Sequence, residues 1–170
     1  MSQIKIYSRE EVDKPFREVA MERFGYGRGA ISKAAEEALI RWTSTISAIN
    51  SSIEKIVEKA KKDNRILAVI LFGSYARKEP SFRDVDVGLL LYKSEESSSV
   101  YFDYAALVGG ENYLDLSVIN SLPVEVQMSA FDDAVVLYSS NEPALHDYTI
   151  TLIKKSAEVR HLIREALESV

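Results

Sequence analysis

Residues 66–92, ILAVILFGSYARKEPSFRDVDVGLLLY, hold two apolar runs separated by a charged turn. Continuous apolar runs rich in β-branched residues are typical of strands buried on both faces of a sheet, so ILAVILF and VDVGLLLY predict two central strands. The first run stops at Gly73 and Ser74, and the second opens with Asp84 and Asp86. The turn between the two strands is therefore the first place to look for a functional site.

The residues around this turn predict an anion site beside a metal site. A strand that turns into a helix presents unpaired backbone N–H groups, which Gly73 would let a phosphate approach closely and Ser74 would supplement with a hydroxyl. Asp84 and Asp86 lie two residues apart, so on a strand their carboxylates face the same side. Adjacent carboxylates repel one another unless a cation neutralises them, and an oxygen-only ligand set suits Mg²⁺. Each feature alone is also typical of an ordinary turn or a solvated strand edge, so the prediction of a nucleoside triphosphate site depends on their combination.

The remainder of the chain predicts an α+β fold in two parts. The first part, residues 1–48, reads as a strand at IKIY followed by helices from about Asp13 to Phe24 and from Ala30 to Trp42. The Ser- and Thr-rich stretch after Trp42 predicts a boundary, with a new helix capped near Ser52. The second part, residues 49–170, adds a third strand in NYLDLSVIN, short elements of unassigned type over residues 122–130 and in VVLY, and a long terminal helix over about residues 144–167.

Composition limits the classes of function. The 170 residues are 46% apolar and include no cysteine, which excludes disulfides and thiolate metal sites. No apolar stretch approaches the ~20 residues needed to span a bilayer, and MSQIKIYSREEV lacks the pattern of a secretory signal, so we expect a cytoplasmic protein. The net charge of −5 argues against a broad nucleic-acid surface, although residues 1–48 carry eight basic and seven acidic residues, a net of +1.

The motif resembles that of a known enzyme superfamily. Gly73-Ser74-x-Ala76-Arg77, with Asp84-x-Asp86 eleven positions after Gly73, is similar to the pattern of the DNA polymerase β superfamily of nucleotidyltransferases, and most of all to its minimal nucleotidyltransferase family. The resemblance extends over about residues 53–138. It implies a polymerase-β-like domain with a mixed sheet flanked by helices.

The resemblance also implies a reaction. Members bind an NTP with two Mg²⁺ ions and transfer a nucleoside monophosphate to an acceptor hydroxyl. Carried onto this chain, the metal ligands and catalytic residues are Asp84, Asp86 and, from the third strand, Asp115. The triphosphate would be held by the turn residues Gly73, Ser74 and Arg77.

The acceptor implied by the minimal family is a tyrosine of a HEPN-type toxin, which receives AMP from ATP and makes this chain an antitoxin. Lys78 stands where the family usually has Gly, and Arg83 where it often has Ser. These departures keep open an alternative, a repressor or toxin-neutralising binding protein with a vestigial nucleotide site. A small-molecule adenylyltransferase of the antibiotic-modifying type is a second alternative.

The first 48 residues resemble a ribbon-helix-helix domain, in which two chains pair their short strands and insert the ribbon into the DNA major groove. That resemblance implies a homodimer with Gln3, Lys5 and Tyr7 directed at DNA. A helical hairpin that only dimerises fits the same pattern, since an unpaired ribbon strand needs a partner in either case.

Overall fold

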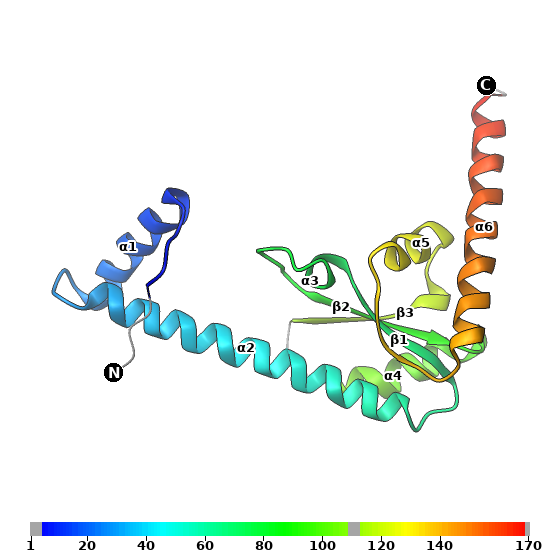
Figure 1. Ribbon diagram of the computed structural model, residues 1–170, viewed down its shortest axis with the longest axis horizontal. Coiled ribbons are helices and arrows are strands. Elements are labelled where there is room, and N and C mark those ends of the chain that lie inside the picture. The colour runs from blue at the N-terminus through cyan, green and yellow to red at the C-terminus, as the bar shows by residue number, and fades with distance from the viewer. Residues whose placement is uncertain (1–4, 109–112, 169–170) are drawn as a thin grey trace. The chain divides into compact units, whose positions relative to one another are not determined.

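The computed structural model describes residues 5–108 and 113–168 (Figure 1). The chain divides between Ala48 and Ile49 into two compact units. The elements, in order, are helices α1 (Glu10–Phe24) and α2 (Ala30–Ala60), strand β1 (Ile66–Phe72), α3 (Gly73–Ala76), β2 (Val85–Leu91), α4 (Ser97–Val108), β3 (Leu114–Val118), α5 (Val124–Asp132), β4 (Val135–Ser139) and α6 (Glu142–Glu168), with 3₁₀ turns η1 (Ser94–Glu96) before α4 and η2 (Ile119–Ser121) after β3.

The start of the chain differs from the sequence prediction in two respects. The described part of the predicted first strand, residues 5–7, is irregular, because a lone strand has no neighbour for its backbone hydrogen bonds. Helix α1 begins at Glu10 rather than near Asp13, so Pro15 lies inside the helix and not in its first turn. Three acidic residues in the first turn favour the earlier start through the helix dipole.

Helix α2 runs without a break through the Ser- and Thr-rich stretch, so the prediction of a separate helix capped near Ser52 is wrong. The hydroxyl of Thr43 donates to the carbonyl oxygen of Leu39 at 2.9 Å, which satisfies it without leaving the helix. Farther along, Ile49, Ser52 and Ile56 are all buried on one helical face. Packing of that face outweighs the low helix propensity of the stretch.

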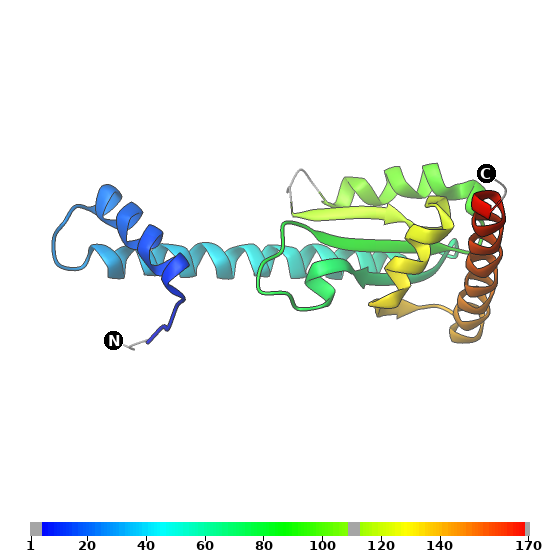
Figure 2. The ribbon, with the colours of Figure 1, turned by 90° about the horizontal axis from the view of Figure 1, so that it is seen from above.

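The second unit is built on a mixed sheet with strand order β3-β2-β1-β4. Strands β1 and β2 are central, as their apolar runs predicted, and they pair antiparallel. Strand β4 pairs antiparallel with the other edge of β1, and β3 pairs parallel with β2. The predicted mixed sheet flanked by helices is confirmed (Figure 2).

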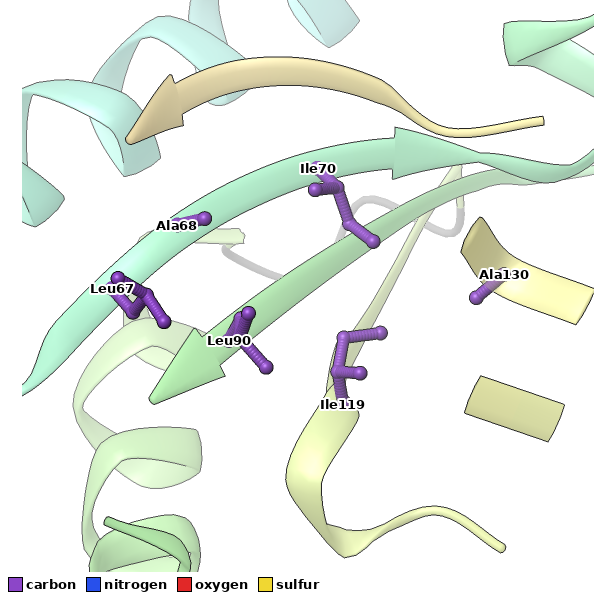
Figure 3. Close-up of a cluster of buried hydrophobic side chains, with 6 residues drawn as sticks. All are labelled: Leu67, Ala68, Ile70, Leu90, Ile119 and Ala130. Carbon is purple, nitrogen blue, oxygen red and sulfur yellow. The ribbon is translucent and has the colours of Figure 1, made fainter. Parts of the chain in front are cut away.

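The core is formed where helices cover the sheet. A cluster of buried side chains from β1, β2, η2 and α5 packs under α5 and the start of α6; its members are Leu67, Ala68, Ile70, Leu90, Ile119 and Ala130 (Figure 3). Gly88 in β2 makes room for this cluster, since a Cβ there would lie 2.6 Å from Cδ1 of Ile119. Helix α4 and the last turns of α2 lie on the other side of the sheet in Figure 1.

Two helices of this unit bear on the predictions. Helix α4 begins inside the serine-rich stretch that reads as a loop in the sequence. Helix α6 confirms the long terminal helix and starts at Glu142, slightly earlier than expected. Among the described residues, no helix has both the length and the apolar character required to cross a membrane.

Candidate active site

The turn after β1 is shaped by Gly73. Its φ of 74° lies in the left-handed region, which residues with a side chain adopt only at a cost. A Cβ built on Gly73 would overlap the Asp86 carboxylate and lie 3.1 Å from its Cγ. The expected helix after the turn is the single turn α3, which is too short to contribute much of a helix dipole. An anion at this turn would therefore be bound by individual donors, such as the backbone N–H of Gly73 and the hydroxyl of Ser74, and not by a helix dipole.

The sheet brings two of the predicted carboxylates together. Asp86 lies opposite Phe72 of β1 on one side and opposite Asp115 of β3 on the other. Residues paired in adjacent strands direct their side chains to the same face of the sheet, so the carboxylates of Asp86 and Asp115 are neighbours. Asp84 comes directly before the first residue of β2. Asp84 and Asp86 are half-buried, whereas Asp115 is exposed.

Electrostatic repulsion is concentrated on Asp86. Burial raises the pKa of Asp86 above its ordinary value, and the negative charges of Asp84 and Asp115 raise this pKa further. The Asp84 carboxylate has a cationic partner, since the Arg83 guanidinium donates to its Oδ2 from Nε at 3.0 Å and from Nη2 at 2.9 Å. Arg83, which replaces the serine often found in the family, therefore binds one of the carboxylates predicted to hold metal.

The three carboxylates do not form a preassembled metal cage. Across residues 5–108 and 113–168, no three Asp, Glu or His side chains are grouped tightly enough to hold an ion as they stand. The donor set nevertheless fits Mg²⁺ in its chemistry, because every available ligand atom is a carboxylate oxygen. A divalent cation would also relieve the repulsion that raises the Asp86 pKa.

Arg77, predicted to contact phosphate, is held by two carboxylates. Its Nε donates to Oε1 of Glu79 at 2.6 Å, and its Nη1 forms an ion pair with Oδ2 of Asp133. Asp133 also accepts a long hydrogen bond, 3.4 Å, from the backbone N–H of Gly73. Asp133, which comes just before β4, belongs to no motif in the sequence. Its place beside Gly73 depends on the pairing of β4 with β1, for which the sequence offers no local indication.

The family model described as Polymerase beta, Nucleotidyltransferase matches residues 54–143, just over half of the chain. The chain belongs to this family. Its match begins within α2 and ends at the start of α6, so it includes the whole sheet and the turn at Gly73. The prediction that this protein is a nucleotidyltransferase of the polymerase β superfamily is thereby confirmed.

Solved structures share the fold of this nucleotidyltransferase. A crystal structure described as a toxin–antitoxin with AMP-PNP superposes with a TM-score of 0.53 at 13% identity, covering 70% of this chain and 95% of that one. A mutant of the toxin–antitoxin MntA-HpeT superposes with a TM-score of 0.52 at 11% identity, with the same coverage of 70% and 95%. At such identities the similarity concerns the fold. No curated protein sequence matches the chain significantly.

The charged loop of the nucleotidyltransferase carries its departures from the family pattern. Lys78 adopts φ 56°, the left-handed conformation that suits the glycine usual at this position. Its N–H donates to the carbonyl oxygen of Tyr75 at 3.0 Å, which closes the turn after α3. The ring of Tyr75 meets that of Phe82 edge to face, with centroids 4.9 Å apart, and ties the two ends of the loop together. Lys78 therefore keeps the backbone conformation of a glycine at this position and adds only a side chain.

Replacing Lys78 with Gly is expected to leave transfer unchanged and to alter the free energy of unfolding by no more than about 1 kcal/mol, since relief of the left-handed strain offsets the added freedom of the unfolded chain. Lys78→Val should instead destabilise by more than about 1 kcal/mol, because a β-branched residue tolerates this conformation poorly. Urea unfolding of both variants tests the pair. Equal free energies of unfolding for the two variants would contradict the claim that the backbone at position 78 is strained for residues with a side chain.

The residues predicted to read DNA are only partly described. Gln3 lies outside the described residues, while Lys5 and Tyr7 are exposed and adjacent, with Nζ of Lys5 5.1 Å from the centroid of the Tyr7 ring. The structure adds an apolar groove in the first unit, where Ile6, Phe16 and Trp42 are among the lining residues. Trp42 is 61% exposed, which is unusual for so large an apolar side chain.

Proposed function

We propose that this nucleotidyltransferase transfers AMP from ATP to a tyrosine hydroxyl of a HEPN-type partner and so acts as an antitoxin. The observation that carries the proposal is the pairing of Asp86 with Asp115 beside the Gly73 turn, within the segment that belongs to the family. The fold shared with two toxin–antitoxin structures supports the choice of a protein acceptor.

The side chains suit an in-line displacement at the α-phosphorus. The acceptor oxygen forms a bond to phosphorus while the bond to the bridging oxygen of the β-phosphate breaks, and pyrophosphate leaves. Asp84, Asp86 and Asp115 would hold two Mg²⁺ ions, which when bound stabilise charge on the attacking and leaving oxygens. The Gly73 N–H and the Ser74 hydroxyl would donate to phosphate oxygens, and Arg77 would neutralise part of their charge.

Asp115 has a distinct role in this arrangement. It is exposed at the sheet edge formed by β3, where an acceptor on another protein can approach. Its carboxylate would take up the proton of the attacking hydroxyl, while the half-buried Asp86 stays beside the Gly73 turn.

Incubation of the full chain with a HEPN-type protein, Mg²⁺ and ATP labelled at the α-phosphorus tests the proposal. We expect label on a tyrosine of the partner, located by mass spectrometry of its peptides, and none when Mg²⁺ is chelated. A stable complex without label would favour the alternative of a toxin-neutralising binding protein. Label on an aminoglycoside or another small hydroxyl compound, with none on the protein, would favour the antibiotic-type alternative.

For residues 1–48 we propose that two copies of the chain pair. The exposed apolar residues of the groove support this, as does the irregular segment 5–9, which pairs with no strand among the described residues. The molar mass of the full chain in solution tests it, and a monomer at high concentration would reject both the dimer and a ribbon that binds DNA. A mobility-shift assay with upstream DNA at low salt separates a DNA-binding dimer from one that only associates.

A further inference from the structure

Asp133 contacts two groups of the turn that is proposed to bind phosphate, the backbone N–H of Gly73 and the guanidinium of Arg77. Asp133 directly follows α5 and lies two residues before Val135, which pairs with Leu71 of β1. This pairing fixes the carboxylate beside the turn, with its side chain 19% exposed. One oxygen accepts from the N–H of Gly73, and the other pairs with the guanidinium of Arg77.

Both partners of Asp133 are donors that an incoming triphosphate needs. The Gly73 N–H and the Arg77 guanidinium are groups of this turn that can donate to an anion, and a carboxylate presents its oxygens to them much as a phosphate does. The hydrogen bond from Gly73, at 3.4 Å, is long and therefore weak. A phosphate with more oxygens and more charge can replace the carboxylate at both donors.

A role in stability alone does not account for the ion pair between Asp133 and Arg77. Asp133 adds a fourth negative charge to a region that already holds Asp84, Asp86 and Asp115, and it contributes to the raised pKa of Asp86. Arg77 does not need this partner for neutralisation, because Glu79 binds its Nε at 2.6 Å. A like charge next to the bound phosphates weakens their binding unless it moves away.

We propose that Asp133 sets the affinity for the nucleotide by competing with its phosphates for Arg77 and the Gly73 N–H. In the free enzyme the carboxylate occupies these donors, and on binding Arg77 exchanges Asp133 for a phosphate oxygen. Asp133 is thus an affinity-determining residue, which keeps the turn ordered and lowers occupancy by weakly binding anions. This inference rests on the nucleotide site of the proposed function.

Titration calorimetry of the full chain with ATP and Mg²⁺, without acceptor, tests the inference. Asp133→Asn keeps the shape and removes the charge, so we expect the Kd for ATP to fall about three- to tenfold. In a separate transfer assay with acceptor, KM for ATP should be lowered and kcat should not be raised. Asp132→Asn is the matched control, since it removes the same charge from an exposed neighbour and should leave Kd unchanged. Arg77→Gln should weaken binding and reduce the gain from Asp133→Asn when the two are combined.

The outcomes separate this inference from the proposed function. If the wild-type protein binds ATP and folded Asp133→Asn binds it equally or more weakly, competition by Asp133 is ruled out and the nucleotide site stands. If neither protein binds ATP, both proposals fail. Should Asp133→Asn not fold, Asp133→Ser removes the charge with a smaller polar side chain and is judged by the same criterion.

Discussion

Asp86→Asn is expected to abolish nucleotidyl transfer, by roughly a thousandfold or more, while raising the melting temperature of the metal-free protein. The loss follows from the proposed metal site, because Asp86 pairs with Asp115 in the sheet and is the carboxylate on which the charges of both Asp84 and Asp115 act. The gain in stability follows because burial and neighbouring charges disfavour the ionised form of Asp86, and Asn carries no charge. Transfer assays and thermal unfolding measure the two effects separately.

The stability gain has a defined dependence on pH. The pKa of Asp86 is raised in the folded state above its ordinary value of 3.8, so the folded protein binds this proton more readily than the unfolded chain does. The resulting stabilisation is present below pH 3.8 and is lost as the pH rises through the higher folded pKa. The difference in melting temperature between Asp86→Asn and wild type should therefore be largest near neutral pH and shrink toward pH 3.8.

Asp147→Asn provides the control for this prediction, because it removes the same charge from an exposed position on α6. It should change neither transfer nor the dependence of stability on pH. Asp84→Asn should also lose transfer. Transfer by Asp86→Asn within tenfold of wild type would contradict the assignment of the site.

Local patterns sufficed where burial dominates the choice of structure. The continuous apolar sequences of β1 and β2 predict central strands, because such strands are buried on both faces. In the structure every residue of β1 but the last is buried. The new helix predicted to start near Ser52 was wrong because that prediction relied on propensity, while burial of Ile49 and Ile56 favours a continuous α2. The start of α4 was predicted as a loop because it is rich in serine, and the rest of the helix stayed ambiguous in the sequence although Val100 and Tyr104 are buried.

The site shows the same division between local and long-range information. Gly73, Ser74, Asp84 and Asp86 could be named from one stretch of sequence because they flank a single turn. Asp133 could not, because it reaches the turn only through the pairing of β4 with β1, some sixty residues away in the chain. The contact between Asp133 and Arg77, on which the proposed competition with phosphate depends, follows from long-range strand pairing and not from a local sequence pattern.

Gly73→Ala is expected to destabilise the protein by about 1–3 kcal/mol and to reduce transfer by about a hundredfold or more. At φ 74° any side chain strains the backbone, and the new methyl group would overlap the carboxylate of Asp86. Since Asp86 lies between Phe72 and Asp115 in the sheet, its carboxylate has to rotate away from the turn, and the distance between the predicted metal ligand and the phosphate donors increases.

Gly27→Ala is the matched control for Gly73→Ala, because Gly27 has no positive φ and a Cβ there would meet nothing within 4 Å. Urea unfolding and transfer assays on both variants separate a general cost of losing a glycine from the specific overlap with Asp86. If Gly73→Ala transfers as well as Gly27→Ala does, the close contact between the turn and Asp86 is not required for catalysis. A selective loss at Gly73 would instead show that the turn and the carboxylate act as one unit, because a single methyl group would disable both the proposed phosphate donor and the proposed metal ligand.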